Sequence, residues 1–397
     1  MSDKPSPTSV RSFRLYRASA GDAPLNLNEH AGDEPLRQLY PEMVPRTLEA
    51  LRRDDAAAAA DLPTTLVLDA TEHGASDIHI DPAHEGCVVR FRINGVLYDA
   101  ATFLADGAQR LVNQIKGAAE IDPMRSFTPQ EGRWRQEIDD HHVDLRVTTI
   151  PSVAGDKIAI RLLDPQRANR QFENIGLSDD HLARLNTWAE NPDGLFLTVG
   201  PTGSGKTTTL YALLQRFRTS ARSVTTIEDP VEYRLEGLTQ IQVNERQGLT
   251  FPAAIRSMLR LDPNIVMVGE VRDDASATAA ADAAITGRVV MSSLHCRDAA
   301  GAITALRNRG VSNHQIAASL RVVVAQRLVR QLNPEARVEV RPDEADLYWL
   351  KAMGKTAPAV CYDTPAHAGR QAITGEGRIG VYEVLELTEP EVELILA

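Results

Sequence analysis

The sequence predicts an α/β protein in which a P-loop domain, built on a parallel sheet, follows a smaller α+β domain. Residues Gly200–Thr207 fit the phosphate-binding pattern G-x-x-x-x-G-K-[ST] at every fixed position. From residue 195 onward, short apolar runs alternate with helical patterns, which is typical of a parallel sheet. Earlier in the chain, Val88–Ile93 alternates apolar and basic residues and leads into the hairpin dipeptide Asn94-Gly95, which indicates antiparallel strands.

The helices and strands follow from apolar periodicity and from the residues that flank each segment. Thr250 is a good N-cap for a helix over 251–261, and Pro263 stands just beyond its end. The sequence predicts helices at 66–73, 179–190, 208–214, 251–261 and 319–332, and strands at 78–80, 88–93, 143–150, 195–199, 224–227, 265–268 and 289–291.

Length and composition restrict the class of protein. The chain has 397 residues, 43% hydrophobic and 24% charged, which suits a soluble globular protein of two or three domains. A net charge of −11 argues against a protein that coats nucleic acid non-specifically, although a local basic channel stays possible. The three cysteines are far apart, so we expect neither a disulfide framework nor a C-x-x-C site.

The sequence shows neither a signal peptide nor a membrane-spanning segment. The first residues are polar, without the apolar core of a signal peptide. No run approaches the roughly 18 apolar residues of a membrane span. We therefore expect a cytoplasmic protein that is peripheral at a membrane through its partners.

Changes in composition predict the domain boundaries. The first segment is rich in Pro, Ser, Asp and Gly, which is typical of a flexible arm or a reduced docking module. Its alanine-rich run, Asp54–Asp61, fits either a helix-to-linker junction or a plain surface helix. The expected divisions are the arm at 1–62, the α+β domain at 63–165, a linker at 166–194 and the P-loop domain at 195–397.

The P-loop predicts a site for a nucleoside triphosphate. Its glycines let the backbone turn and aim N–H groups at phosphate oxygens, and the helix N-terminus adds partial positive charge. Lys206 would reach the β- and γ-phosphates, and the Thr207 hydroxyl would bind Mg²⁺. A Gly-rich turn that merely contains a lysine is the alternative. The predicted binding residues are Gly200, Pro201, Thr202, Gly203, Ser204, Gly205, Lys206, Thr207 and Thr208.

Three later strands each lead into a residue that can do chemistry. Glu228, Glu270 and His295 follow the strands at 224–227, 265–268 and 289–291. In parallel sheets, ligands bind at the carboxyl ends of the strands, so we expect these side chains beside the P-loop.

Each of these residues also has a structural alternative. Glu270 would polarise the attacking water and help to hold Mg²⁺, or it would be a capping acid. Glu228, with Asp229 and Glu232, forms an acidic turn that would order Mg²⁺ or water, or would be a solvated loop. His295 would sense the γ-phosphate, or it would be structural.

A basic stretch over 299–334 contains five arginines and no acidic residue. A nucleic-acid surface is conceivable there, but no aromatic residue interleaves with the arginines for base stacking. The predicted helix over 319–332 favours a basic side that faces solvent or another subunit.

Taken together, these motifs resemble the secretion ATPase superfamily that powers type II secretion and type IV pilus assembly. The resemblance covers roughly residues 63 to 390 and keeps the order of the family's signatures. The matching segments are Ala75–Pro82, Arg90–Leu97, Pro129–Arg133, Asp144–Pro151, the aspartate box Thr226–Glu232, the Walker B region Gly248–Asp273 and the histidine box Thr286–His295.

The resemblance implies a PAS-like N-terminal domain joined to a RecA-like ATPase domain, with six protomers in a ring. ATP and Mg²⁺ would bind between the two domains, where Arg133 and Arg146 would reach the γ-phosphate as arginine fingers. The implied catalytic set is Glu270, Glu228, His295, Arg133 and Arg146, and the implied metal-binding set is Thr207, Glu228 and Glu270.

The expected function is an ATP-hydrolysing hexameric motor for assembly of a type IV pilus or a type II secretion pseudopilus. Its partner would be an inner-membrane platform protein, with no direct contact to nucleic acid. A nucleic-acid translocase or helicase on the same RecA-like core is the alternative from another class. A regulatory subunit that binds ATP without hydrolysing it is a third possibility.

The chain also departs from the family pattern at several positions. Asn264 stands where the family usually has Asp, and Arg288 stands at the place of a second histidine, where it would keep a donor for the nucleotide. Asn333–Ala336 replaces the first of two C-x-x-C pairs, and only Cys361 is present near the second. Because one cysteine cannot form a tetrahedral site, and His367 would not complete it, we expect no zinc. The segment 334–372 is still expected to form an appendage.

Overall fold

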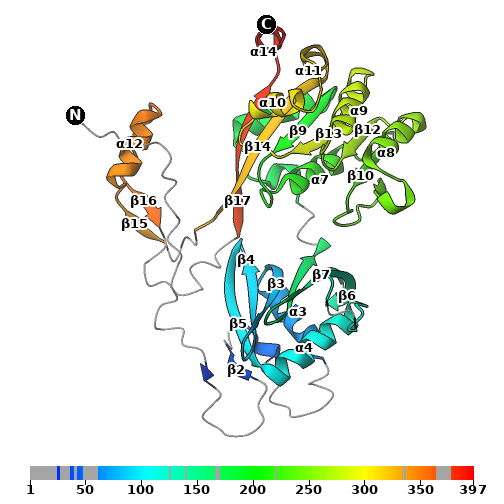
Figure 1. Cartoon of the computed structure of the whole chain (residues 1–397). Coiled ribbons are helices and arrows are strands. Elements are labelled where there is room, and N and C mark those ends of the chain that lie inside the picture. Colours follow the sequence, from blue (N-terminus) through cyan, green and yellow to red (C-terminus); the bar gives the residue numbers. More distant parts are fainter. Residues whose placement is uncertain are drawn as a thin grey trace, which may run out of the picture.

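Within the described part of the chain, the backbone forms an eight-stranded sheet, a seven-stranded sheet and a small two-stranded sheet (Figure 1). The eight-stranded sheet comes from the first half of the chain and the seven-stranded sheet from the second half. The computed structural model describes residues 25–26, 36–39, 43–47, 61–124, 127–138, 141–165, 170–219, 221–332, 334, 337–363 and 377–397.

The first sheet is antiparallel, in the order β1-β2-β5-β4-β3-β8-β7-β6. One face packs on α3 (Leu62–Glu72) and α4 (Ala105–Ala118) around a single apolar core. The other face carries the charged residues, since every second side chain of β4 from Cys87 to Ile93 is buried and those between are not. The strands are β1 (Leu25–Asn26), β2 (Leu36–Leu39), β3 (Ala75–Ala83), β4 (Gly86–Ile93), β5 (Val96–Leu104), β6 (Gln130–Ile138), β7 (His141–Ser152) and β8 (Gly155–Leu163).

Parts of the predicted N-terminal arm belong to this sheet. Strands β1 and β2 lie inside residues 1–62, and β2 pairs with β5. The backbone N–H groups of Arg46 and Thr47 donate to the buried Asp69 carboxylate, each at 3.0 Å. These segments are therefore attached to the first sheet, whereas the run Asp54–Asp61 lies outside the described residues except for Asp61.

The second sheet has the order β11-β10-β12-β13-β9-β14-β17 and is parallel except for β17. All residues of β9, β10, β12 and β13 are buried, as expected for parallel strands covered on both faces. The strands are β9 (Leu195–Val199), β10 (Val224–Glu228), β11 (Thr239–Gln242), β12 (Ile265–Val268), β13 (Val289–Leu294), β14 (Leu320–Arg330) and β17 (Arg378–Glu386).

Helices cover this sheet on its two faces, in two separate apolar clusters. One cluster takes in α6 and α7, and the other takes in α8, α9, α10, α11 and α14. The N-cap expected at Thr250 forms, because its side chain accepts from Ala253 N–H. Ser178 caps α6 in the same way by accepting from His181 N–H. The helices are α6 (Asp179–Glu190), α7 (Lys206–Phe217), α8 (Phe251–Met258), α9 (Asp274–Ile285), α10 (Gly301–Arg307), α11 (Asn313–Ser319) and α14 (Glu389–Leu396), with 3-10 turns η2 (Phe172–Asn174), η3 (Glu245–Gln247) and η4 (Leu259–Leu261).

The helix predicted over 319–332 is wrong, because residues Leu320–Arg330 form strand β14. This strand pairs in parallel with β9 and in antiparallel with β17. All four residues of Val322–Ala325 are buried. A central strand covered on both faces can bury consecutive apolar side chains, whereas one face of a helix cannot. Its β-branched valines also favour a strand.

The appendage expected over 334–372 is partly described. It contains β15 (Val338–Val340), α12 (Glu344–Ala352) and β16 (Cys361–Asp363), and it lies to one side of the two large sheets (Figure 1). No residue of α12 is buried. Among the residues that the structure describes, no helix combines the length and the apolar character needed to cross a membrane.

Candidate functional site

The loop between β9 and α7 has the geometry of an anion cradle. Gly203 and Gly205 adopt left-handed φ angles of +75° and +89°, and α7 starts immediately afterwards at Lys206. No side chain caps this helix, so its first N–H groups are available to an anionic ligand. The loop follows the buried carboxyl end of a central strand, as the P-loop pattern requires.

Lys206 is folded back onto its own loop. Its Nζ donates to the carbonyl oxygens of Gly200 at 2.9 Å and Pro201 at 3.1 Å. Burial lowers the pKa of Lys206, whereas the charge of Glu270 acts to raise it. The ammonium group is therefore near both the phosphate cradle and the acid at the end of β12.

The P-loop rests on strand β14, and the sequence did not reveal this contact. The buried Gln326 donates from Nε2 to the carbonyl of Ser204 at 2.8 Å. A Cβ at Gly200 would stand 2.5 Å from the Gln326 carbonyl oxygen, so the loop and the strand touch through their backbones. The hydroxyl of Ser204 is buried and has no hydrogen-bond partner. The sequence pattern predicts a helix over 319–332, so the contact of Gln326 with the loop depends on an arrangement that only the tertiary structure reveals.

Glu270 and His295 come together at the carboxyl ends of β12 and β13. Nε2 of His295 lies 3.2 Å from Oε1 of Glu270. Arg272 holds the other carboxylate oxygen with Nε at 3.1 Å, and its Nη1 lies 2.9 Å from Asp229 Oδ2. Arg272 stands two residues after Glu270 in the Walker B segment, and the sequence pattern predicted no separate role for it.

Glu228 lies at the end of β10, but its carboxylate is engaged inside the domain. It is 3% exposed and accepts hydrogen bonds from the side chains of Tyr211, Thr226 and Gln240. Burial raises the pKa of Glu228, and the three donors oppose that shift. This differs from the expectation that Glu228 faces a metal ion, because its carboxylate is buried and turned toward three donors of its own domain.

Arg133 and Arg146 face each other across β6 and β7 in the first sheet. Arg146 extends to the second sheet, where Nη2 donates to the carbonyl of Val231 at 2.7 Å and Nη1 lies 3.4 Å from Glu232. Partial burial lowers the pKa of Arg146, and Glu232 counteracts this shift. Arg133 is exposed. The structure therefore brings one of the two predicted fingers to the acidic turn after β10.

Two residues at which the chain departs from the family pattern lie at the amino ends of strands in the second sheet, opposite the P-loop. Arg288 precedes β13, donates to the Leu259 carbonyl and pairs with Asp262. The expectation that Arg288 keeps a nucleotide contact is therefore wrong, because it lies at the amino ends of strands whose carboxyl ends meet the P-loop. Asn264 precedes β12 and accepts from Ser223 N–H at 2.7 Å, so it too lies at the amino end of its strand, away from the P-loop.

The residues present fit a magnesium-bound nucleotide. Mg²⁺ usually takes one or two protein oxygens, substrate phosphates and several waters, so it needs no all-protein cage. The Thr207 hydroxyl at the start of α7 and the Glu270 carboxylate supply such oxygens. Over the described ranges, no three His, Cys, Asp or Glu side chains are grouped as a metal site. His367 and all of Asn333–Ala336 except Pro334 lie outside these ranges.

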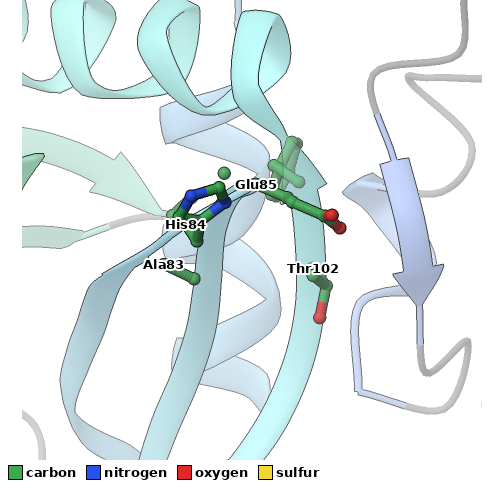
Figure 2. A pocket seen from close by; sticks show the side chains of 7 residues that line it. Ala83, His84, Glu85 and Thr102 are labelled. Atoms are coloured by element: carbon green, nitrogen blue, oxygen red, sulfur yellow. The ribbon is translucent and has the colours of Figure 1, made fainter. Parts of the chain in front are cut away.

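A cavity of about 270 Å³ lies elsewhere, at the β3–β4 turn of the first sheet. Figure 2 shows His84 and Glu85 from this turn, together with Thr102 of β5, around it. The cavity has no glycine-rich helix N-terminus, which distinguishes it from the P-loop.

Comparison with known proteins identifies relatives over most of the chain. The family model described as "Type II/IV secretion system protein" matches residues 52–397. The chain is 37% identical to type II secretion system protein E of Pseudomonas aeruginosa over 368 residues, which is 91% of this chain and 72% of that protein. It is 35% identical to type II secretion system ATPase E of Vibrio cholerae over 384 residues, covering 96% of this chain and 76% of that protein.

Solved structures show the same fold at lower sequence identity. The Legionella pneumophila ATPase DotB has a TM-score of 0.61 and 21% identity, over 84% of this chain and 82% of its own. The pilus retraction motor PilT, solved with bound ADP, has a TM-score of 0.55 and 22% identity, over 83% of this chain and 84% of its own.

Proposed function

Because the chain belongs to the type II/IV secretion system protein family, we propose that it is an ATP-hydrolysing motor of a type II secretion or type IV pilus apparatus. The observation that supports this proposal is the grouping of three side chains at one end of the second sheet. There, the P-loop lysine, the Glu270 carboxylate and His295 meet at the carboxyl ends of neighbouring strands. A P-loop lysine beside a carboxylate at the end of a neighbouring strand is a recurring part of P-loop nucleotidases.

The P-loop would bind ATP through the free N–H groups at the start of α7. Lys206 would exchange its two loop carbonyls for the β- and γ-phosphate oxygens, which offer a stronger, charged acceptor. Thr207 and Glu270 would hold Mg²⁺. When bound, Mg²⁺ neutralises charge that develops on the phosphate oxygens.

Glu270 would orient and polarise the water that attacks the γ-phosphate. His295 and Arg272 each hold one of its carboxylate oxygens, which fixes the plane of the group. Since His295 contacts Glu270 directly, a shift of Glu270 on loss of the γ-phosphate would move His295 and the residues that follow β13.

Arg146 and Arg133 would complete the site from the first sheet. In related nucleotidases, a supplied arginine raises the rate by about 10³- to 10⁵-fold, because the transition state spreads negative charge over the phosphoryl oxygens. Arg146 already contacts the turn after β10, and in the ATP-bound state it would exchange the Glu232 carboxylate for the γ-phosphate. Such exchange would couple hydrolysis to domain motion.

The motor would act as a ring of six copies in the cytoplasm. An inner-membrane platform protein would hold it at the membrane and receive its motion. The named relatives are secretion proteins, and none of them supports the nucleic-acid alternative.

Phosphate release in Glu270→Gln tests the proposed activity. We expect ATP hydrolysis to be lost while binding of an ADP analogue stays, because the amide cannot polarise water but the cradle is intact. Glu245→Gln, an exposed acid in η3, is the matched control and should hydrolyse ATP normally. Equal hydrolysis in Glu270→Gln and wild type would contradict the assignment.

A second measurement separates the two classes of motor. A cytoplasmic fragment of the platform protein should stimulate hydrolysis, whereas single-stranded DNA should not. Stimulation by DNA alone would favour the translocase alternative.

A further inference from the structure

The Glu228 carboxylate is the centre of a hydrogen-bond network beneath the P-loop helix. Oε2 accepts from the hydroxyl of Tyr211, a residue of α7. Oε1 accepts from Thr226 Oγ1 at 2.5 Å and from Gln240 Nε2 at 3.2 Å. Both oxygens of this buried carboxylate therefore accept hydrogen bonds from side chains of the same domain.

Gln240 connects this carboxylate to the turn that follows β10. Its Nε2 also donates to the carbonyl of Tyr233 at 3.2 Å, and its Oε1 accepts from Leu235 N–H at 2.7 Å. The amide of Gln240 is thus shared between Glu228 and the backbone of residues 233–235. A displacement of this turn would pull directly on the carboxylate.

Tyr233 provides a second link between the same turn and α7. Its ring packs edge-on against Tyr211, with 4.7 Å between the ring centroids. The side chain of Thr208, which directly follows the P-loop, acts to lower the pKa of Tyr233 against the effect of burial, so the two side chains are neighbours. The turn is therefore connected to the first and second turns of α7.

The outer side of the turn is held by the first sheet. Arg146 binds the Val231 carbonyl and the Glu232 carboxylate. The contacts therefore run without a gap from Arg146, through the turn at 230–235 and Glu228, to the helix that starts at Lys206.

We propose that Glu228 is a positioning residue rather than a metal ligand, and that it ties the P-loop helix to the turn held by Arg146. This inference rests on the proposed nucleotide site. Loss of the network would let α7 shift relative to the turn, so the affinity for nucleotide would fall whether or not Mg²⁺ is present. A metal ligand would act only when Mg²⁺ is bound.

The test uses the full chain and a fluorescent ADP analogue, with affinity measured in EDTA and in Mg²⁺. Glu228→Gln and Thr226→Val should both weaken binding by about five-fold or more under both conditions, the lower end of typical coupling between sites. Thr226→Val is informative because Thr226 is fully buried and acts through the carboxylate. Thr225→Val, whose side chain lies on the opposite face of β10, is the control and should bind as wild type.

The result that overturns the proposal is a loss confined to Glu228→Gln and to Mg²⁺, with Thr226→Val unchanged. Unchanged binding in both variants would overturn it equally. If the wild type fails to bind the analogue under either condition, the proposed function itself is contradicted.

A double-mutant cycle tests whether the first sheet acts through this network. Glu232→Gln removes the ion pair with Arg146 and should weaken binding in the wild type. In the Thr226→Val background the same change should have little further effect, because the link to α7 is already broken. Additive losses would show that the turn and Glu228 act separately, against the proposal.

Discussion

The left-handed glycines of the P-loop illustrate how single residues fix the site. Gly203 and Gly205 both adopt positive φ angles, which cost a residue with a Cβ roughly 1–2 kcal/mol. A Cβ at Gly205 would also stand 3.2 Å from Gln326 Nε2, whereas a Cβ at Gly203 would meet nothing within 4 Å. A side chain at Gly203 would therefore cost backbone strain alone, whereas one at Gly205 would cost backbone strain and crowding against Gln326.

Replacing each glycine by alanine should destabilise the protein by different amounts. Gly203→Ala should lose only the backbone term, about 1–2 kcal/mol. Gly205→Ala should lose more, because Gln326 must also move away from the loop. Urea unfolding of the nucleotide-free chain measures both losses, and equal losses would contradict the tight contact with Gln326.

Glu228 should also give the stability a defined pH dependence. Burial raises its folded-state pKa above 4.5, so the folded chain binds the proton more tightly than the unfolded chain. Stability from this group is fully present below the unfolded pKa and is lost as the pH rises through the folded pKa. Glu228→Gln should remove this component, so the variant should gain stability relative to wild type over that pH range. A pH-independent difference in unfolding midpoint would contradict this expectation.

At the scale of elements, β14 supports the P-loop from below. Its inner residues are buried on both faces, and Gln326 is the polar exception that reaches the Ser204 carbonyl. Strands β12 and β13 end just before Glu270 and His295, whereas β14 continues past the end of β9 beside the loop. The role of β14 is therefore to hold the loop's backbone in place.

Gln326→Leu should destabilise the protein and weaken nucleotide binding together. The Ser204 carbonyl would lose its buried donor, which costs about 1–3 kcal/mol. Arg330→Gln, at the exposed end of the same strand, is the control and should change neither property. Thermal unfolding and ADP-analogue titration measure the two effects. A loss of stability with unchanged affinity would show that β14 is not needed for nucleotide binding by the loop.

At the scale of the whole molecule, the two large sheets meet at the turn after β10. Arg146 supplies the contact from the first sheet, with a hydrogen bond to Val231 and an ion pair with Glu232. The ion pair is partly exposed, so it contributes little to stability by itself. Its importance is geometric, because it sets where the arginine lies relative to the P-loop.

Arg146→Ala should reduce hydrolysis by about 10³-fold or more if the arginine serves as a finger. It should also increase the radius of gyration in small-angle scattering, because one contact between the sheets is removed. Arg135→Ala changes an exposed arginine that pairs with Asp144 within the first sheet, and it is the matched control. Normal hydrolysis in Arg146→Ala would contradict the finger assignment.

The sequence by itself determined the P-loop segment, the neighbouring parallel strands that end at Glu228, Glu270 and His295, and four of the helices. Each of these depends on local information: apolar runs, caps and the rule that ligands bind at the carboxyl ends of parallel strands. Glu270 and His295 were predicted to lie beside the P-loop, and the structure brings them together.

Only the tertiary structure decided the features that depend on partners distant in sequence. The segment Leu320–Arg330 is a strand because β9 and β17 pair with it, and an apolar period alone could not distinguish this from a helix. Glu228 faces Tyr211, Thr226 and Gln240 rather than solvent, since three elements converge on it. Arg146 reaches Val231 across 85 residues of sequence. Side-chain direction and cross-element pairing follow from packing, which no local pattern encodes.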